Sequence, residues 1–270
     1  MVKDALGDRM KANYEDRYRF YLTRRTPVII RVDGNAFHTF CKNFEMPYDM
    51  VMKNSMWDTA KDLCKNIMGC QIAYVQSDEI SLLLVDYKKL TSQAWFDYNL
   101  QKITSIAAAM ATKAFNLAFP KYAEEVLGDS DMYNRVYLPK FGKAMFDARA
   151  FNIPISEVCN YFIWRQQDAT RNSIETLGRC FFSSKELHKV NCNQIQDKLM
   201  VEKNVNWNDM PTHFKRGACV VKKLEEIEID TPHQKGKVMR STWDVDTEIP
   251  IFTQDRNYIE QYLHAEEGEA

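Results

Sequence analysis

Pro27-Val-Ile-Ile-Arg-Val-Asp33-Gly34 decides the fold, because it is an almost wholly apolar run that ends in a carboxylate. Such a run is typical of a buried central strand. A second run, Gln71-Ile-Ala-Tyr-Val-Gln-Ser77-Asp78-Glu79, ends in two acids and continues directly into Ile80-Ser-Leu-Leu-Leu-Val85. This pattern predicts a tight hairpin with Asp78 and Glu79 at its tip. If the hairpin lies beside the first strand, Asp33 and Asp78 face each other.

Two neighbouring carboxylates repel each other unless a cation lies between them. Oxygen ligands without a matching His or Cys favour magnesium or manganese, and this layout is typical of a two-metal phosphoryl-transfer site. Each acid alone also has an ordinary interpretation as a turn residue or a solvated strand end. Two such sites, each tied to an apolar strand, favour the metal site. Gly34 would let a phosphate approach the backbone, and the next segment could begin a helix whose N-terminus favours anions.

Further elements surround these strands. Apolar residues at helical spacing predict helices over 48–67 and 92–118, and a short strand is expected at 144–151. The resulting order of strand, helix, strand, strand, helix and strand is ferredoxin-like. We therefore expect an α+β fold, in which an antiparallel sheet has helices packed on one face and a C-terminal α/β extension follows. The extension is expected to contain a helix over 154–170, short helices within 184–203, strands at 218–221 and 236–243 joined by the charged run 222–230, and a closing helix over 255–265.

Composition excludes several classes of protein. The 270 residues carry a formal net charge of −1, so RNA contacts would have to come from local basic patches. None of the seven cysteines forms a Cys-x-x-Cys pair, which argues against a zinc site and favours reduced thiols and a cytoplasmic location. No apolar run approaches the length that spans a membrane, so no membrane partner is expected.

Five ordered motifs carry a resemblance to a known family. Arg31-Val-Asp-Gly-Asn-Ala-Phe-His38 and Gln76-Ser-Asp-Glu-Ile-Ser81 resemble the RxDGxxFH and SDExS signatures of the tRNA-His guanylyltransferase family, including its Thg1-like branch. The similarity runs from about residue 5 to residue 222. The three later matches are Phe146-Asp-Ala-Arg149, Asn160-Tyr-Phe-Ile-Trp-Arg-Gln-Gln-Asp168 and Phe214-Lys-Arg-Gly217.

The resemblance implies a fold and a reaction. The family's catalytic domain resembles the palm of polymerases and nucleotide cyclases, which we expect over residues 1–153, with 154–270 completing the same functional unit. The family adds nucleotides to RNA 5′ ends in the 3′–5′ direction, so the resemblance implies tRNA, ATP and GTP as substrates and a homotetramer. It also implies two Mg²⁺ ions bound by Asp33, Asp78 and the Gly34 carbonyl. Glu79 is expected as a third catalytic residue, which could be a further ligand or could orient one.

The resemblance also suggests which residues bind nucleotides. Two triphosphates must bind close together, which requires cationic side chains. Arg165 could clamp a phosphate, or could instead pair with Asp168 on its own helix. Phe37 could stack on a base or fill the core, and His38 could bind a phosphate or be structural. The predicted nucleotide-binding set is Asp33, Gly34, Asn35, Ala36, Phe37, His38, Ser77, Asp78, Lys102 and Arg149. The set predicted for RNA or a second triphosphate is Arg31, Arg165, Asn172, Lys215 and Arg216.

One departure from the family pattern bears on the substrate. Where eukaryotic members carry His-Ile-Asn-Asn after the WRxxD helix, this chain has Thr170-Arg171-Asn172-Ser173. The missing His favours template-dependent 5′-end repair over addition of the extra guanosine to tRNA-His. Two other functions remain open. A palm-type nucleotide cyclase is disfavoured because Gln76-Ser-Asp-Glu-Ile80 lacks the glycines of a Gly-Gly-Asp-Glu-Phe hairpin, and a non-catalytic RNA-binding protein is disfavoured because both acids are present.

Overall fold

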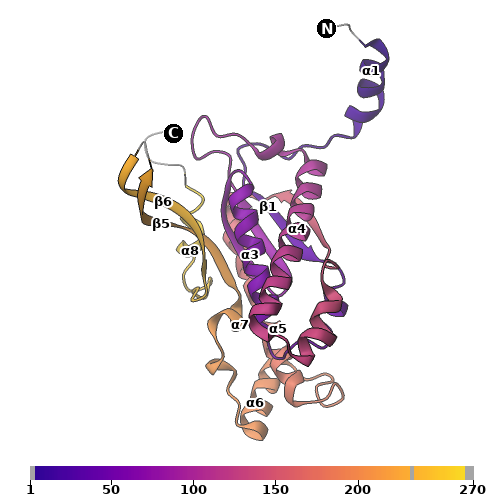
Figure 1. The fold of residues 1–270 in the computed structure, drawn as a ribbon, viewed down its shortest axis with the longest axis vertical. Helices are drawn as coiled ribbons and strands as arrows, with labels where there is room; N and C mark the ends of the chain where they lie inside the picture. Colours follow the sequence, from indigo (N-terminus) through magenta and orange to yellow (C-terminus); the bar gives the residue numbers. More distant parts are fainter. Residues whose placement is uncertain (1–3, 232–233, 265–270) are drawn as a thin grey trace.

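The protein is built around a six-stranded antiparallel sheet with the strand order β4-β1-β3-β2-β5-β6 (Figure 1). This computed structural model describes residues 4–231 and 234–264. The strands are β1 (Val28–Gly34), β2 (Cys70–Gln76), β3 (Glu79–Leu84), β4 (Phe146–Asn152), β5 (Ala218–Thr231) and β6 (Gln234–Asp246). The helices are α1 (Ala5–Met10), α2 (Phe37–Phe40), α3 (Met50–Asn66), α4 (Leu100–Leu127), α5 (Ile155–Phe181), α6 (Cys192–Lys203), α7 (Thr212–Arg216) and α8 (Asn257–Glu260).

The first half has the predicted ferredoxin-like order β1, α3, β2, β3, α4 and β4, and α3 and α4 lie on one face of the sheet (Figure 1). Asp49 caps α3 by accepting a hydrogen bond from the Met52 amide. Asn99 caps α4 in the same way, so that helix begins later than the predicted residue 92. The helix also runs to Leu127, beyond the predicted end at 118, and Gly128 follows with φ +54°.

Alternate residues of β1 have opposite environments. Val28, Ile30 and Val32 are fully buried in the large apolar cluster under α3 and α4. Arg31 and Asp33 point to the other face, because side chains alternate along a strand. The central strand therefore delivers its two polar residues to one face only.

The second half covers that other face and widens the sheet. Val158 and Phe162 of α5 pack on it together with α8, while α6 and α7 pack against the end of α5. The α5 helix runs to Phe181, well past the predicted residue 170. The charged run 222–230 is the continuation of β5, which pairs with β6 along a long two-stranded arm (Figure 1). The predicted closing helix forms only as the short α8, and residue 265 lies outside the described residues.

The N-terminal segment projects away from this body, and α1 has no buried residue (Figure 1). Within the part of the chain that the structure describes, no helix combines the length and the apolar character needed to cross a membrane.

Candidate active site

Asp33 and Asp78 meet at one end of the sheet, where β1 ends and the β2–β3 turn begins. Asp33 lies opposite Glu79 in the β1–β3 register, and the Gly34 amide donates a hydrogen bond to the Asp78 carbonyl over 3.1 Å. Ser77 adopts φ +50°, which closes the turn between β2 and β3 in two residues. The hairpin lies beside the first strand, as the sequence pattern predicted, and it brings the two acids together.

The Asp78 carboxylate has no positive partner among the described residues. It accepts a hydrogen bond from the Ser77 hydroxyl over 3.0 Å, and no Lys or Arg there forms an ion pair with it. Burial raises the pKa of Asp78, and the charge of Asp33 raises it further, while the Ser77 hydrogen bond opposes both. Asp78 therefore lies in an environment where a bound cation would stabilise its charged form.

Glu79 is placed very differently from its neighbour. Its two carboxylate oxygens accept hydrogen bonds from Nε and Nη2 of Arg165, each over 2.7 Å, and both side chains are over nine-tenths buried. Burial raises the pKa of Glu79, and the Arg165 contacts oppose that rise. Asp168 also binds Arg165, over 3.1 Å, and Arg31 lies 4.0 Å from Glu79. Arg165 is therefore held inside the protein and is not free to clamp a phosphate.

The loop after Asp33 shows why Gly34 and Phe37 stand where they do. Phe37 is buried, and its ring packs against Phe40, Phe115 and Phe146 with centroids 4.9 to 5.5 Å apart. The base-stacking prediction for Phe37 is wrong, because its ring fills the core. A Cβ at Gly34 would lie 2.4 Å from that ring, so any side chain there would clash. Asn35, Ala36 and His38 are exposed on the same loop.

Two arginines lie on the same face as Asp33. Arg31 and Arg149 are direct cross-strand partners on β1 and β4. Arg149 is about half exposed and lies 3.8 Å from Asp33 and 3.1 Å from Asp147. Arg31 is largely buried, and its Nε has no hydrogen-bond partner among the described residues. Arg149 is therefore close enough to Asp33 to contact an anion bound there, whereas Arg31 lies on the same face beside Glu79.

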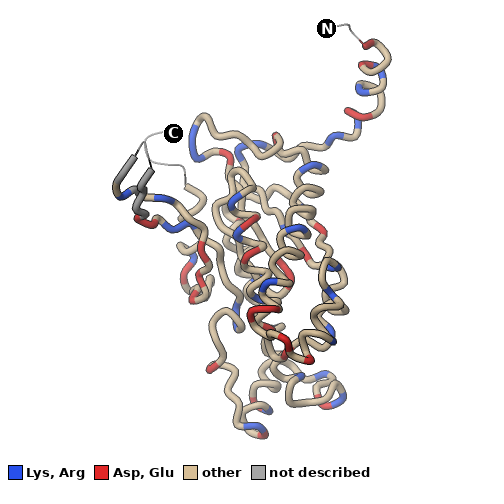
Figure 2. The backbone as a smooth tube through the Cα atoms, in the orientation of Figure 1, with Lys and Arg blue, Asp and Glu red and all other residues tan. Residues whose placement is uncertain are grey.

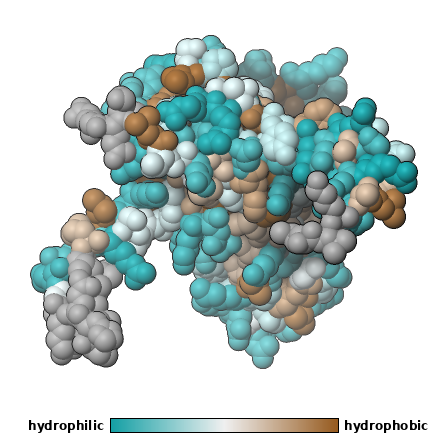
Figure 3. Space-filling model, turned by 90° about the horizontal axis from the view of Figure 1, so that it is seen from above, coloured by the Kyte–Doolittle hydropathy of each residue, from teal (hydrophilic) through white to brown (hydrophobic). Residues whose placement is uncertain are grey.

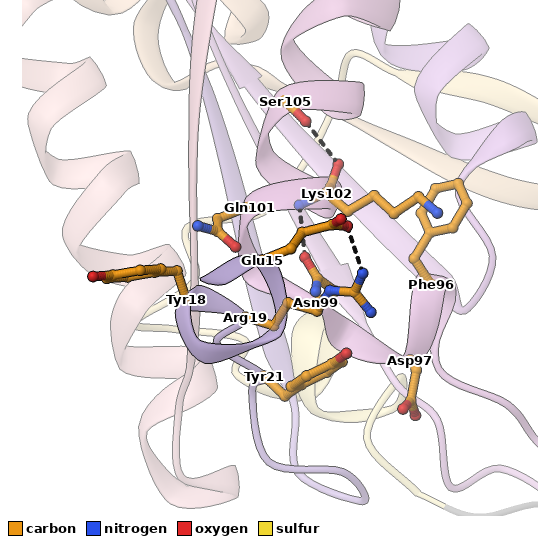
Figure 4. A pocket seen from close by; sticks show the side chains of 10 residues that line it. All are labelled: Glu15, Tyr18, Arg19, Tyr21, Phe96, Asp97, Asn99, Gln101, Lys102 and Ser105. Atoms are coloured by element: carbon orange, nitrogen blue, oxygen red, sulfur yellow. Dashed lines mark hydrogen bonds and ion pairs between the residues drawn. The ribbon is translucent and has the colours of Figure 1, made fainter. Parts of the chain in front are cut away.

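Lys102 is not brought to this end of the sheet. It lies in the first turn of α4, over the Phe96 ring at 4.7 Å, in a separate cavity of about 610 Å³ (Figure 4). That cavity adjoins the N-terminal segment through Tyr18 and Arg19 (Figure 4). The Thr112 hydroxyl accepts a hydrogen bond from the Phe146 amide beside the acids, ten residues further along α4. At 1.5 Å per residue this places Lys102 roughly 15 Å away along the helix.

A cavity of about 280 Å³ opens next to the acidic turn. Ser77 and Asn172 line it, together with Phe214, the first residue of the last motif. Three further aromatic side chains there were not singled out by sequence reasoning: Phe44, Tyr48 and Trp57. His213 lines it too, and its Nε2 is buried without a partner among the described residues. Burial lowers the pKa of His213, because it disfavours the charged form of the ring, and the nearby charge of Lys53 lowers it further. The spacing of these residues along the chain gave no signal that they meet.

Lys215 and Arg216 lie in α7, at the edge of this region. The Lys215 ammonium donates to the Asn208 carbonyl over 2.6 Å, so it is already engaged within the protein. The Arg216 carbonyl accepts a hydrogen bond from the buried Tyr74 hydroxyl over 2.7 Å. α7 is thus fixed to β2, the strand that ends at the acidic turn.

The residues around the acids fit a divalent ion only if the substrate supplies most of its ligands. Across residues 4–231 and 234–264, no group of three or more His, Cys, Asp or Glu is placed to hold a metal. Glu79 is turned to Arg165, which leaves Asp33, Asp78 and backbone oxygens. A site with one or two carboxylates that completes its shell with water and phosphate is what Mg²⁺ prefers.

Comparison with known proteins places this geometry in a family. The family model for tRNA(His) guanylyltransferase, Thg1, matches residues 7–154. A solved bacterial Thg1-like protein in complex with ATP is 44% identical, covers 97% of this chain and all of its own, and superposes with a TM-score of 0.80. A complex of a bacterial Thg1-like protein with GTP is 42% identical over the same coverage, with a TM-score of 0.75. The tRNA(His) guanylyltransferase of Saccharomyces cerevisiae is 26% identical over 217 residues, which are 75% of this chain and 85% of the yeast protein. This chain therefore belongs to the tRNA(His) guanylyltransferase family of nucleotidyltransferases.

Proposed function

We propose that the chain is a 3′–5′ nucleotidyltransferase that adds nucleotides to the 5′ end of tRNA. In this proposal it repairs truncated 5′ ends against a template strand, after ATP or GTP has activated the 5′ phosphate. The observation that carries the proposal is the meeting of Asp33 with an Asp78 that lacks a positive partner among the described residues. The bacterial relatives bound to ATP and to GTP support nucleotide binding at this fold.

Asp33, Asp78 and the Gly34 carbonyl would hold two Mg²⁺ ions at the end of β1. Such ions, when bound, lower the pKa of an attacking hydroxyl and neutralise the charge on the departing pyrophosphate. Asp33 and Asp78 contribute the negative charge that fixes them in place. Glu79 acts as a positioning residue in this scheme, because its carboxylate is occupied by Arg165.

Arg149 and Arg31 would bind the triphosphate. Arg149 is partly exposed beside Asp33, and a guanidinium can bind two phosphate oxygens at once. Asn35, Ala36 and His38 would border the phosphates from the exposed loop, and Ser77 from the turn. The aromatic cavity beside Ser77 has the shape and chemistry for a nucleobase, and Asn172 lies on its wall. Lys102 stays outside this assignment because of its distance, and the homotetramer and cytoplasmic location remain predictions.

The proposal of repair rests on the run Thr170-Arg171-Asn172-Ser173. Arg171 is bound to Asp168 over 2.8 Å, and Ser173 is buried with its hydroxyl bonded to the Thr170 carbonyl. Asn172 is therefore the member of this run that lines the cavity and is exposed. Without a His to select one base, base pairing with a template would choose the incoming nucleotide.

The test compares two RNAs with all four triphosphates and magnesium. One is a tRNA that lacks its first nucleotide, and the other is an intact tRNA-His, each read by gel as extension of the 5′ end. We expect faster addition to the truncated tRNA. Faster addition of a guanosine to intact tRNA-His would place the chain with the guanylyltransferases proper, and a cyclic nucleotide product without RNA extension would refute nucleotide addition altogether.

A further inference from the structure

A groove of about 930 Å³ lies between the C-terminal half of α3 and the two-stranded arm of β5 and β6. Cations line both of its walls. Lys61 and Lys65 come from α3, and Lys222 and Arg240 come from the arm. Trp243 lies between them, with the Lys222 ammonium 5.2 Å from its ring. Figure 2 shows Lys and Arg along the arm.

The lining of the groove carries an excess of positive charge, although the chain as a whole has a net charge of −1. Two carboxylates, Asp58 and Asp62, also line it, against the four cations. The Asp58 carboxylate is already engaged by Lys61 over 2.9 Å and by the Tyr122 hydroxyl over 2.6 Å. The cavity beside the acidic turn is lined by two acids and one Lys, and that of Figure 4 by two of each sign. Of these three cavities, this groove is the one with an excess of cations, whereas the whole chain carries −1.

The groove is separate from the candidate active site. Gly69 and Cys70 line it at the start of β2, while the acidic turn follows Gln76 at the other end of that strand. Six residue steps at 3.3 Å per step place the two sites roughly 20 Å apart. A ligand that occupied both would have to be a long polyanion.

We propose that this groove binds the phosphate backbone of the body of the RNA whose 5′ end lies at Asp33 and Asp78. The inference rests on the proposed function, because the proposed function is what names tRNA as the substrate. Lysines and arginines at this spacing attract phosphates without reading sequence, and an aromatic ring beside them can stack on an unpaired base. A nucleoside triphosphate alone is too short to explain cations so far from the acids.

The surface around the groove suits RNA better than a protein partner. Viewed from above, this end of the molecule is largely hydrophilic, with scattered hydrophobic side chains (Figure 3). Leu224 and Met239 are exposed on the arm, as is Met68 at the end of α3. Among the side chains that the structure describes there, these three fall short of the desolvated core that stable protein interfaces bury. Self-association through the arm is nonetheless an outcome that the test must detect.

The test is the double charge reversal Lys65→Glu/Lys222→Glu, since both side chains are exposed and line opposite walls. The matched control is Lys185→Glu/Lys189→Glu, which changes the net charge equally in the loop before α6. Binding of full-length tRNA is measured across a salt series. We expect the groove variant to bind about tenfold more weakly, with a slope of log K against log salt that is smaller by roughly two phosphate contacts. The control should bind like the parent protein.

An assay of nucleotide addition on two RNAs distinguishes a role of the groove in binding from a role in catalysis. On a hairpin of a few base pairs, too short to span the distance, the groove variant should extend the 5′ end at the parental rate. On full-length tRNA at limiting concentration it should lose as much rate as it loses affinity. Unchanged tRNA affinity and salt slope would overturn the inference, and so would a change confined to the oligomeric state in sedimentation. If the parent protein extends neither RNA, the proposed function fails, while the tRNA-binding titration still decides the groove.

Discussion

The two faces of the sheet are made by the same strands, but beside β1 one face is wholly apolar and the other combines an apolar cluster with a polar group. Under α3 and α4, Val28, Ile30 and Val32 contact only an apolar cluster. On the α5 face, Arg31 and Asp33 join a polar group that includes Glu79, Arg165 and Arg149. The difference teaches that β1 serves both purposes through its two-residue period: Val28, Ile30 and Val32 only stabilise the fold, whereas the other set begins with the buried Ile29 and ends with the two polar residues of the site. Stability and activity should therefore be separable by substitutions at neighbouring positions.

The largest effect expected is on the catalytic side. Asp33→Ala or Asp78→Ala should lower the rate of nucleotide addition about a thousandfold or more, because each removes a ligand of ions that supply several kcal/mol to the transition state. The melting temperature should hardly change. Asp147→Ala is the matched control, since Asp147 lies opposite Asp33 in the register but is more exposed and bound to Arg149. Near-parental turnover of either test variant in magnesium alone would refute the two-metal assignment.

The next effect concerns the buried ion pair on the same face. Arg165→Met should lower the free energy of unfolding by about 3–5 kcal/mol, because it removes both short hydrogen bonds to the buried Glu79 carboxylate and leaves only Arg31, at 4.0 Å, as a cation near it. The pKa of Glu79, already raised by burial, should rise further without Arg165. The deficit should therefore shrink as the pH falls and Glu79 takes up a proton.

The control for this pair is Arg171→Met on the same helix, where the guanidinium is about half exposed and bound to Asp168. It should change stability by less than about 0.5 kcal/mol. Denaturant unfolding measured at two pH values reports both variants. Equal losses in the two, or a deficit for Arg165→Met that grows at acid pH, would show that the buried pair is not what stabilises the turn.

The apolar face should respond in the opposite way. Ile30→Ala should lower the free energy of unfolding by about 2–5 kcal/mol, because the side chain is fully buried and its loss leaves a cavity. The rate of nucleotide addition, measured well below the melting temperature, should stay close to that of the parent. A rate loss comparable to that of Asp33→Ala would mean that the two faces are not separable.

The smallest effect expected is a shift in one titration. Asp33→Asn should lower the pKa of Asp78, because the Asp33 charge contributes to its rise. Carbon NMR of labelled aspartate carboxyls measures this directly. In the parent protein, the raised pKa of Asp78 means that protons compete with metal from a higher pH than for an ordinary aspartate. Metal affinity should accordingly fall early on acidification, and an unshifted Asp78 in the variant would show that the two acids do not sense each other.

The sequence predicted those parts of the site that depend on local pattern. The apolar run before Asp33 predicted β1, and the two runs on either side of Asp78 predicted the β2–β3 hairpin. Because both acids were placed at strand ends, the sequence also predicted that they meet, and they do. The Arg165–Glu79 pair could not be derived in this way, because the two residues are 86 positions apart and Asp168 offered a nearer partner. Phe37 sits between the exposed Asn35 and His38, and only the packing on Phe115 and Phe146 shows that its ring points inward.

The ends of the helices were also poorly predicted, for a physical reason. α4 continues through Pro120 to Leu127 because it stays packed on the sheet side, with Phe119 and Ala123 buried. Tertiary packing here outweighs the proline, whose local preference is to end a helix. Lys102 was predicted to bind the nucleotide because two triphosphates require cationic side chains, but the length of α4 places it roughly 15 Å from the acids.

The alignment of β1 between its two neighbours has a consequence for the fidelity of folding. Asp33 lies opposite Glu79 on one side and Asp147 on the other. A slip of one residue in either ladder would turn Arg31 and Asp33 into the apolar layer under α3 and α4 and move Ile30 and Val32 to the α5 face. The cost of burying those charges excludes the slipped chain from the folded population. The alignment that brings the acids together is therefore also the alignment that gives the most stable fold. A chain with misaligned acids would be inactive, but it would also be too unstable to accumulate.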